Sequence, residues 1–239
     1  MKKQIMYKEL AKYYDLIYSW KDYKKEIKII KRLISKYKKS KGKELLDVGC
    51  GTGHHLRYLK NDFICTGIDS NAEMLKIGKK NVKDVVFKKA DMIKFDLHKK
   101  FDVILCLFSS IGYVKTYANL KRTIRNFSRH LKSGGIAIIE PWLTKSAFKA
   151  GFPAMTTYDG KNIKIARLNV SKVKNTVSIL DMDYLIAEKN RDIKHYADRH
   201  ELRLFDANKT LPFMKEAGLQ TKFLKKGLMD RGLILGIKK

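Results

Sequence analysis

The chain has 239 residues, of which 44% are hydrophobic, so it is long enough to bury a substantial core in one large domain. Its formal net charge of +28 comes mostly from lysine and leaves two interpretations open: a surface for nucleic acid or another polyanion, or lysines scattered over solvated faces. No apolar run approaches the roughly 18 residues of a membrane helix, and the charged N-terminus lacks the apolar region of a signal peptide.

Helix and strand patterns alternate in the first part of the chain. Apolar residues recur at helical spacing from Asp22 to about Ser40, and Gly42 follows this expected helix. Strands that alternate with helices predict a parallel sheet covered on both faces. The expected strands are Glu44–Val48, Phe63–Ser70, Asp84–Met92, Phe101–Phe108 and Ile136–Trp142, and the helices are His54–Lys60, Asn71–Lys80 and Asn119–Gly135, the last closed by Gly134 and Gly135.

The pattern changes after Trp142. Three strand-like segments, Lys161–Val170, Val173–Ile186 and Ile193–Phe205, are joined by short polar turns, which predicts antiparallel hairpins. The helix Asn208–Ala217 and the strands Leu219–Leu224 and Leu233–Lys238 then complete the main sheet. We therefore expect an N-terminal helical lid (1–43), a core (44–143 and 206–239) and an antiparallel insert (144–205) for substrate or dimer contacts.

A glycine-rich turn joins the first strand of the core to the helix that follows it. The segment "LLDVGCGTG" contains Asp47, Gly49 and Gly51, and glycines allow positive φ and close approach of a ligand to the backbone. The next strand ends at Asp69, where an acidic residue reaches a ribose hydroxyl pair in this topology. These features predict a ligand that contains adenosine, although the dinucleotide pattern GxGxxG is not met.

The turn resembles the glycine-rich motif of class I S-adenosylmethionine-dependent methyltransferases. "GIDS", "ADM", "FDVILC" and "LKSGGIAIIEPW" are similar to later segments of that family, in the family's order, over about residues 44–142. The resemblance implies a doubly wound, mostly parallel seven-stranded Rossmann-like α/β sheet and S-adenosylmethionine as the cofactor. It implies methionyl contacts for Asp47, Gly49 and Gly51, a ribose contact for Asp69, adenine contacts for Asp91 and Met92, and further cofactor contacts for Tyr14, Tyr23, Met74 and Phe108, with core packing as the alternative for Met74.

Other segments resemble the N-methyltransferases that act on nucleotide-linked amino sugars. "YDLIYSWKDY", "FSSIGY", "EPW", "HELRLF" and "RGLILG" carry this resemblance over nearly the whole chain. It implies an insert near the substrate, a homodimer and methylation of a sugar amine on a thymidine-diphosphate carrier. The chain departs from that family at Tyr113 and Arg199, near which members carry His. It also lacks the [DNS]PP[YFW] motif of nucleic-acid amino methyltransferases.

The acceptor is expected beyond the carboxyl ends of the strands, where ligands of doubly wound sheets bind. Ser109, Ser110, Tyr113 and Glu140 follow two of these strands and edge this crevice. Ser109, Ser110 and Glu140 are predicted to bind substrate, as is Tyr18, which is also predicted to cover the crevice. A protonated amine must lose a proton before it attacks a methyl group, and holding it in line supplies much of the rate. Tyr14 and Tyr113 are the predicted catalytic groups nearest the amine, with aromatic packing of a lid as their alternative.

Arginines near the C-terminal half are predicted to meet the substrate's pyrophosphate. Arg199 and Arg203 alternate along one strand and share a face, and Arg231 stands in the "RGL" segment. A solvated sheet face or a dimer interface is the alternative. His195 and His200 point to opposite faces of the same strand, so we predict no metal site.

Three functions stay open on the sequence alone. The first is methylation of a small molecule, with N-methylation of a nucleotide-linked amino sugar implied by the resemblance. The second is RNA methylation on the basic surface, which the sequence disfavours without excluding it. The third is a partner protein without activity, against which the intact "DVGCGTG" and Asp69 argue. The cysteines Cys50, Cys65 and Cys106 lack metal-type spacing and lie in or beside apolar runs, so we expect free buried thiols and a cytoplasmic location.

Overall fold

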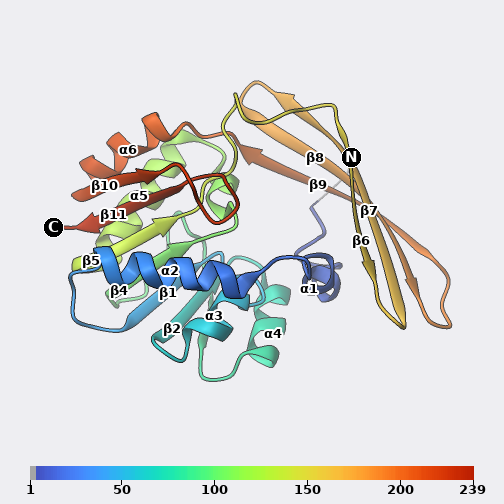
Figure 1. The fold of residues 1–239 in the computed structure, drawn as a ribbon, viewed down its shortest axis with the longest axis horizontal. Coiled ribbons are helices and arrows are strands. Elements are labelled where there is room, and N and C mark those ends of the chain that lie inside the picture. The colour runs from blue at the N-terminus through green and yellow to red at the C-terminus, as the bar shows by residue number, and fades with distance from the viewer. Residues whose placement is uncertain (1–3) are drawn as a thin grey trace.

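Two β-sheets, with helices on both faces of the larger one, make up the computed structural model, which describes residues 4–239 (Figure 1). The larger sheet contains β1 (Glu44–Val48), β2 (Ile64–Asp69), β3 (Val86–Lys89), β4 (Phe101–Cys106), β5 (Leu131–Ile139), β10 (Leu219–Leu224) and β11 (Leu233–Lys238). The helices are η1 (Ala11–Tyr13), α1 (Tyr14–Ile17), α2 (Tyr23–Tyr37), α3 (His54–Leu59), α4 (Ala72–Asn81), η2 (Ser110–Val114), α5 (Tyr117–His130) and α6 (Ala207–Glu216).

The seven strands of the larger sheet lie in the order β10-β11-β5-β4-β1-β2-β3. The pairs β1–β2, β1–β4, β2–β3 and β4–β5 are parallel, whereas β11 is antiparallel to both of its neighbours. The predicted mostly parallel, doubly wound sheet is therefore confirmed. Because β1, β2 and β4 are parallel neighbours, their carboxyl ends meet at one edge of the sheet.

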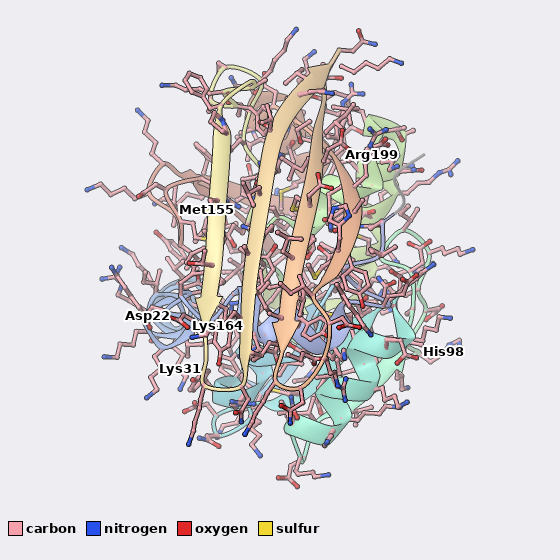
Figure 2. All side chains as sticks on the ribbon, turned by 90° about the vertical axis from the view of Figure 1, so that its right-hand side faces the viewer. Asp22, Lys31, His98, Met155, Lys164 and Arg199 are labelled. Atoms are coloured by element: carbon pink, nitrogen blue, oxygen red, sulfur yellow. The ribbon has the colours of Figure 1, made fainter. Side chains whose placement is uncertain are left out.

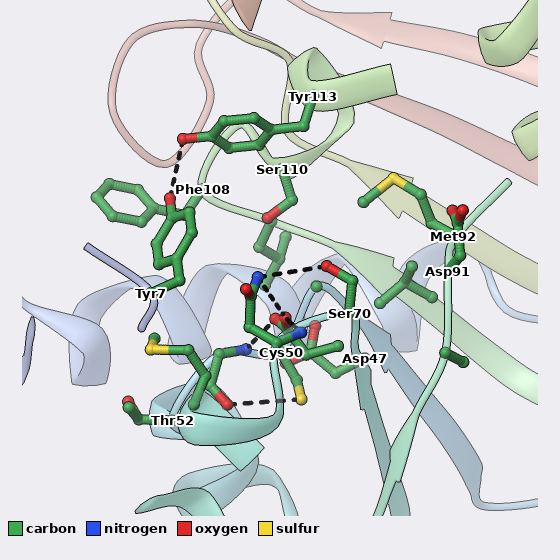
Figure 3. Close-up of a pocket in the computed structure, with 18 of the residues that line it drawn as sticks. Tyr7, Asp47, Cys50, Thr52, Ser70, Asp91, Met92, Phe108, Ser110 and Tyr113 are labelled. Carbon is green, nitrogen blue, oxygen red and sulfur yellow. Dashed lines mark hydrogen bonds between the residues drawn. The ribbon is translucent and has the colours of Figure 1, made fainter. Parts of the chain in front are cut away.

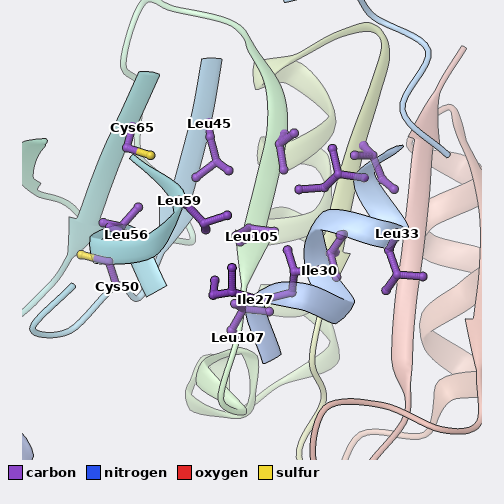
Figure 4. Packing of buried hydrophobic residues seen from close by; sticks show 14 of the residues in the cluster. Ile27, Ile30, Leu33, Leu45, Cys50, Leu56, Leu59, Cys65, Leu105 and Leu107 are labelled. Carbon is purple, nitrogen blue, oxygen red and sulfur yellow. The ribbon is translucent and has the colours of Figure 1, made fainter. Parts of the chain in front are cut away.

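Amphipathic helices cover both faces of this sheet. The Asp22 side chain caps α2 by accepting a hydrogen bond from the Lys25 backbone N–H at 2.9 Å, and the apolar stripe of α2 packs over β4 and its neighbours (Figure 4). Helices α3 and α4 cover the same face, and α5 and α6 cover the opposite face. The stripe of α2 consists of Ile27, Ile30, Leu33 and Ile34.

The smaller sheet is the insert, with strands β6 (Pro153–Asp159), β7 (Ile163–Lys174), β8 (Val177–Glu188) and β9 (Lys194–Arg203) in sequential antiparallel order. The sequence predicted three of these strands and missed β6. That strand begins with proline, lies at the sheet edge and is largely exposed, so it lacks the apolar alternation that marks a half-buried strand.

The segment 4–22 lies between the two sheets (Figure 1). Its buried apolar side chains pack against the inner face of the insert, where Tyr184 is fully buried. The contacts join Met6, Leu10, Tyr13 and Ile17 of the segment to Ile165, Met182, Tyr184 and Ile186 of the insert. The segment is thus fixed by a core of its own and contributes helices of only a single turn.

Two element boundaries differ from the sequence prediction. Helix α5 ends at His130, not at Gly134, because Leu131 is buried and pairs with Phe101 as the first residue of β5. Strand β4 ends at Cys106, two residues earlier than expected, because the backbone turns sharply at Phe108. No helix among residues 4–239 is long and apolar enough to span a membrane.

Ile30 tests the packing of α2 on the larger sheet. Its side chain is 0% exposed, so Ile30→Ala removes buried methyl groups and leaves a cavity. We expect the free energy of unfolding to fall by about 2–5 kcal/mol, measured by urea denaturation. Lys28→Ala, at an exposed position of the same helix, is the matched control and should change it by less than about 0.5 kcal/mol. Equal effects of the two variants would contradict the packing described for α2.

Candidate active site

A cavity of about 330 Å³ opens at the carboxyl ends of β1, β2 and β4 (Figure 3). Segments from the N-terminus, the glycine-rich turn, β2, the segment after β3 and the turn after β4 contribute its walls. Twelve predicted site residues line it: Tyr14, Tyr23, Asp47, Gly49, Gly51, Asp69, Met74, Asp91, Met92, Phe108, Ser110 and Tyr113. The structure therefore brings all the predicted cofactor residues together with part of the predicted acceptor side.

The glycine-rich turn requires glycine where it passes the acceptor side of the cavity. Gly49 has φ +73°, and a Cβ atom there would lie 2.8 Å from Ser110 Oγ. The backbone N–H groups of Gly49 and Cys50 both donate to the Ile68 carbonyl oxygen, at 2.8 and 3.0 Å. These bonds hold the turn against β2 and place bare backbone at the cavity wall.

Two carboxylates lie beneath this turn. Asp47 is 2% exposed, and its Oδ2 atom has no hydrogen-bond partner among residues 4–239. Burial, together with the nearby charge of Asp69, raises the pKa of Asp47 to about 7. Asp69 accepts hydrogen bonds from the backbone N–H groups of Gly51 and Asn71, at 3.0 and 2.9 Å, and burial raises its pKa as well. Asp47 is thus a buried acceptor that lacks a donor, as expected of a residue that meets a ligand cation.

Asp91 and Met92 form another part of the cavity wall, on the side away from Phe108 and Tyr7 (Figure 3). The Asp91 carboxylate accepts a hydrogen bond from the Ile93 backbone N–H at 2.9 Å, which fixes the turn after β3. Met74, 1% exposed, lines the cavity and approaches Gly51. Met74 is therefore buried like a core residue and also lines the cavity, and its contact with the cofactor stays a prediction.

The chain after β4 adopts an unusual backbone conformation. Phe108 and Ser109 have φ values of +49° and +64°, in the left-handed region that residues other than glycine seldom adopt. The Glu140 carboxylate accepts a hydrogen bond from the Phe108 N–H at 2.7 Å, and the Ser109 hydroxyl donates to the Pro141 carbonyl oxygen at 3.2 Å. These bonds from the end of β5 hold the turn, which directs Ser110 and Tyr113 into the cavity.

Four polar side chains lie at the end of the cavity where the methyl acceptor is predicted, which we call the acceptor end: Ser110, Tyr113, Tyr14 and Tyr7. The hydroxyls of Tyr7 and Tyr113 lie 2.9 Å apart, and the Tyr7 ring also contacts the Tyr14 ring with centroids 6.0 Å apart. Burial raises the pKa of each of the three tyrosines well above its ordinary value, so their hydroxyls stay protonated at neutral pH. This end of the cavity therefore offers neutral hydrogen-bonding groups.

The N-terminal segment is attached to the glycine-rich turn through Asp15. Its carboxylate accepts a hydrogen bond from Thr52 Oγ1 at 2.6 Å and lies 3.0 Å from His54 Nε2. The Tyr23 ring stacks on the His54 ring with centroids 4.5 Å apart. The segment thereby forms one wall of the cavity, through Tyr7 and Tyr14.

Six residues predicted for substrate binding do not line the cavity: Tyr18, Ser109, Glu140, Arg199, Arg203 and Arg231. Glu140 is fully buried and Ser109 is 2% exposed, and both support the turn after β4. Tyr18 packs behind the cavity wall against Tyr14 and Phe108, with ring centroids 4.7 and 5.2 Å away. Arg231 donates to Ser109 Oγ at 2.9 Å and lies over the Trp142 ring, 4.4 Å from its centroid.

The other two arginines correct the prediction for the insert. Arg199 and Arg203 do share a face of β9, but residues 198, 200 and 202 are the ones that face inward. Arg199 makes a bidentate ion pair with Asp181 of β8 at 2.6 and 2.9 Å, on the outer face. The Arg203 guanidinium lies over the Tyr117 ring. The alternation was correct, but nothing in the sequence showed which face met the cavity.

Sequence reasoning missed Tyr7, Gln4 and Thr52, which also line the cavity. Tyr7 lies in a helix-poor segment without periodicity, so no pattern marked it. Thr52 stands inside the glycine motif, where a hydroxyl beside the glycines is the signal that marks it. Among the described residues, no group of His, Cys, Asp and Glu side chains is arranged to hold a metal ion.

Comparisons with known proteins agree with this geometry. Residues 45–135 match the model of a family described as "Methyltransferase domain". The dTDP-3-amino-3,6-dideoxy-alpha-D-glucopyranose N,N-dimethyltransferase of Streptomyces fradiae is 32% identical over 232 residues, which cover 96% of this chain and 91% of that protein.

Solved structures extend the similarity to three dimensions. The structure of DesVI from Streptomyces venezuelae has a TM-score of 0.91 at 29% identity and covers 97% of this chain, and the match covers 99% of DesVI. S-adenosylmethionine-bound CalS10, an amino pentose methyltransferase from Micromonospora echinaspora, has a TM-score of 0.83 at 25% identity, with 92% of each chain covered. The chain therefore belongs to the family of S-adenosylmethionine-dependent methyltransferases that includes these amino-sugar N-methyltransferases.

Proposed function

We propose that this enzyme N-methylates a nucleotide-linked amino sugar. The observation that carries the proposal is a cavity with an unpaired buried carboxylate at the glycine-rich turn and the hydroxyls of Ser110 and Tyr113 after β4. The similarity to named amino-sugar N,N-dimethyltransferases over nearly the whole chain supports this substrate class. The relatives that match nearly the whole chain are named for amino-sugar substrates, which does not favour the RNA alternative.

The residues of the cavity fit S-adenosylmethionine. The unpaired Oδ2 of Asp47 offers an acceptor for the ammonium of the methionyl end, and the bare backbone at Gly49 allows close contact. Asp69, at the end of β2, would hold the ribose, and Asp91 and Met92 would flank the adenine. When bound, the cofactor supplies an electrophilic methyl group on a positively charged sulfur.

The enzyme's own residues act on the acceptor amine by placing it and by excluding water. Ser110, Tyr14 and Tyr113 present hydroxyls to the acceptor end, where they would orient the nitrogen toward the glycine-rich turn. Tyr14 and Tyr113 are the catalytic residues that we propose, because both line the cavity. The covering segment, anchored by Asp15, restricts competing hydrolysis and strengthens these polar contacts.

Arg231 is proposed to bind the pyrophosphate of the substrate. It donates to Ser109, the residue beside cavity-lining Ser110, so its guanidinium lies directly behind the acceptor side. Burial lowers its pKa, although a guanidinium keeps its charge at neutral pH. A planar cation stacked on Trp142 is well suited to bidentate phosphate recognition. We do not propose phosphate contacts for Arg199, which is paired with Asp181 on the outer face, or for Arg203, which lies over the Tyr117 ring.

We propose a homodimer formed through the outer face of the insert, residues 144–205. Met155, Leu168 and Leu185 are 67%, 48% and 47% exposed on this face, which Figure 2 shows toward the viewer. The Asp181–Arg199 ion pair balances charge between these apolar positions. A charge-balanced apolar face supports contact with a second copy of a chain whose net charge is +28.

The unpaired buried cysteines Cys50, Cys65 and Cys106 support a cytoplasmic location.

The carboxylate of Asp47 should make cofactor affinity depend on pH. Because its pKa is raised to about 7, the acid is protonated and neutral below pH 7 and cannot balance an ammonium there. We expect the affinity for S-adenosylmethionine, measured by calorimetry, to rise as the pH increases from 5.5 to 7.5. Asp47→Asn should flatten this rise and weaken binding at pH 7.5 by about ten- to a hundredfold, the value of a charge-assisted hydrogen bond. Asp84→Asn, an exposed control, should leave both unchanged; a pH-independent wild type would contradict the role of Asp47.

The substrate proposal is tested by incubation with S-adenosylmethionine and thymidine-diphosphate-linked amino sugars. We expect mass spectrometry to detect sugars that carry one or two added methyl groups. Arg231→Gln should raise the KM for the nucleotide-linked sugar by about ten- to a hundredfold with little change in kcat, because a charged hydrogen bond to phosphate contributes to binding. Arg125→Gln, on the exposed face of α5, is the matched control. An enzyme that binds cofactor but methylates none of these sugars would refute the substrate proposal.

The dimer proposal is tested by adding charge to the outer face. Leu168→Lys with Leu185→Lys places two cations where apolar side chains would meet their counterparts. Light scattering after size exclusion should give twice the 27.7 kDa chain mass for the wild type and the single mass for the double variant. Ile64→Lys, at an exposed apolar position of β2, should remain dimeric. A wild type of single mass would exclude the dimer.

A further inference from the structure

A buried Asp–His pair lies directly behind the tyrosines of the acceptor end. His200 Nε2 is 2.6 Å from Asp198 Oδ2, and these side chains are 4% and 0% exposed. Two side chains approach the other ring nitrogen: the Tyr113 hydroxyl, and Gln4 Nε2 at 3.1 Å from His200 Nδ1. Because the Gln4 amide nitrogen can only donate and Nε2 faces a carboxylate, we assign the tautomer with its proton on Nε2. His200 thus presents an unprotonated nitrogen to Tyr113.

The hydrogen bonds of this cluster run in one direction. Tyr113 uses its hydrogen toward His200, so the Tyr7 hydroxyl, 2.9 Å away, donates to the Tyr113 oxygen. A phenol oxygen has two acceptor sites, and Tyr7 occupies only one of them. The other is available to an amine N–H in the cavity, which Tyr113 lines. A continuous path therefore leads from the cavity through Tyr113 to His200 and ends at Asp198.

The backbone holds this path rigid from both sides. Asp198 Oδ1 accepts hydrogen bonds from the backbone N–H groups of Ile5 and Met6, at 2.7 and 3.4 Å. On the other side, Gly112 allows η2 to approach β9 closely, since a Cβ atom there would lie 3.1 Å from Leu202 Cβ. The imidazole is thus fixed against the Tyr113 hydroxyl by three separate segments of the chain.

We propose that His200, oriented by Asp198, acts through Tyr113 as the acceptor of the proton that the substrate amine loses before methyl transfer. This inference rests on the proposed N-methyltransferase function. An N–H bond of the ammonium breaks, and its proton binds the Tyr113 oxygen. The Tyr113 O–H bond breaks at the same time, and that proton binds His200 Nδ1. The electron pair left on nitrogen becomes the methyl acceptor, and the Asp198 carboxylate stabilises the imidazolium until the proton passes to solvent.

The surroundings explain why Tyr113 needs a base behind it. Burial raises the pKa of Tyr113 well above its ordinary value, so a phenolate does not accumulate and the hydroxyl can only pass a proton on. The titratable groups that contact the His200 ring are Tyr7, Tyr113 and Asp198, and only Asp198 is an acid that can offset a positive charge on the ring. His200 is therefore a positioning residue that does not touch the substrate itself.

His200→Asn separates a proton-accepting role from a structural one. The asparagine side chain can still accept the Tyr113 hydrogen bond, but it cannot take up a proton. At neutral pH we expect kcat to fall by about a hundredfold, the lower end of the usual contribution of a general base, while cofactor affinity and substrate KM change by less than about twofold. At a pH at which the substrate amine is already neutral in solution, the variant should approach the wild-type rate.

His195→Asn is the matched control on the same strand. His195 pairs with Asp183 at 2.9 Å but lies on the outer face, with a side chain that is 59% exposed. His195→Asn therefore replaces a histidine in the same kind of His–Asp pair, but at a position that does not contact the cavity. We expect kcat and its pH profile to stay at wild-type values.

Tyr113→Phe gives a second, independent measurement if His200→Asn lowers thermal stability. It breaks the path and also removes a hydroxyl that orients the amine, so it should lose at least as much kcat as His200→Asn, and the double variant should lose no more than Tyr113→Phe alone. If the wild type methylates the sugar, two results would overturn the path. One is a double variant in which the kcat losses of the single variants multiply, and the other is a His200→Asn enzyme with wild-type kcat at neutral pH. A wild type that methylates no amino sugar would overturn the proposed function and the path together.

Discussion

The left-handed turn after β4 is the constraint on which the acceptor side depends. Two successive residues, Phe108 and Ser109, have positive φ, at a cost of order 1–3 kcal/mol each. The buried Glu140 carboxylate offsets part of that cost by accepting a hydrogen bond from the Phe108 N–H. With the turn in place, Ser110 faces Gly49, and η2 is directed against β9. The strain therefore lies at the site itself, where it positions the residues that we propose to act on the amine.

The site also depends on the N-terminal segment, because this segment contacts both the insert and the core. At one end of the segment, the backbone of Ile5 and Met6 binds Asp198 of β9. At the other end, Asp15 binds Thr52 of the glycine-rich turn. A movement of this segment would therefore open the cavity and loosen the His200–Tyr113 contact together. Cover and proton path are coupled because they share these attachments.

Much of the fold and the cofactor end could be predicted because both follow from local sequence patterns. Apolar periodicity marks the helices and buried strands, and the spacing of Asp47, the glycines and Asp69 depends on a single strand–turn–helix–strand unit. The acceptor end joins η2, β9 and the N-terminal segment, which are far apart in the chain. Tyr7 and His200, for example, are brought together only by tertiary packing. The sequence likewise placed Glu140 after β5, but it did not show whether the side chain enters the cavity or supports the turn after β4.

Burial distinguishes the two histidines of β9, of which only His200 is proposed to accept a proton. His195 and His200 are five residues apart, so strand alternation places them on opposite faces, and each has an aspartate within hydrogen-bond distance. The outer pair is largely exposed, and water and salt screen it, so that its interaction contributes little. The inner pair is withdrawn from water, so the carboxylate acts on the imidazole at low dielectric, and the imidazole contacts Tyr113, which lines the cavity. The odd spacing of His195 and His200 thus has two consequences. The two side chains cannot share a metal ion, and of the two only His200 lies on the face that contacts Tyr113.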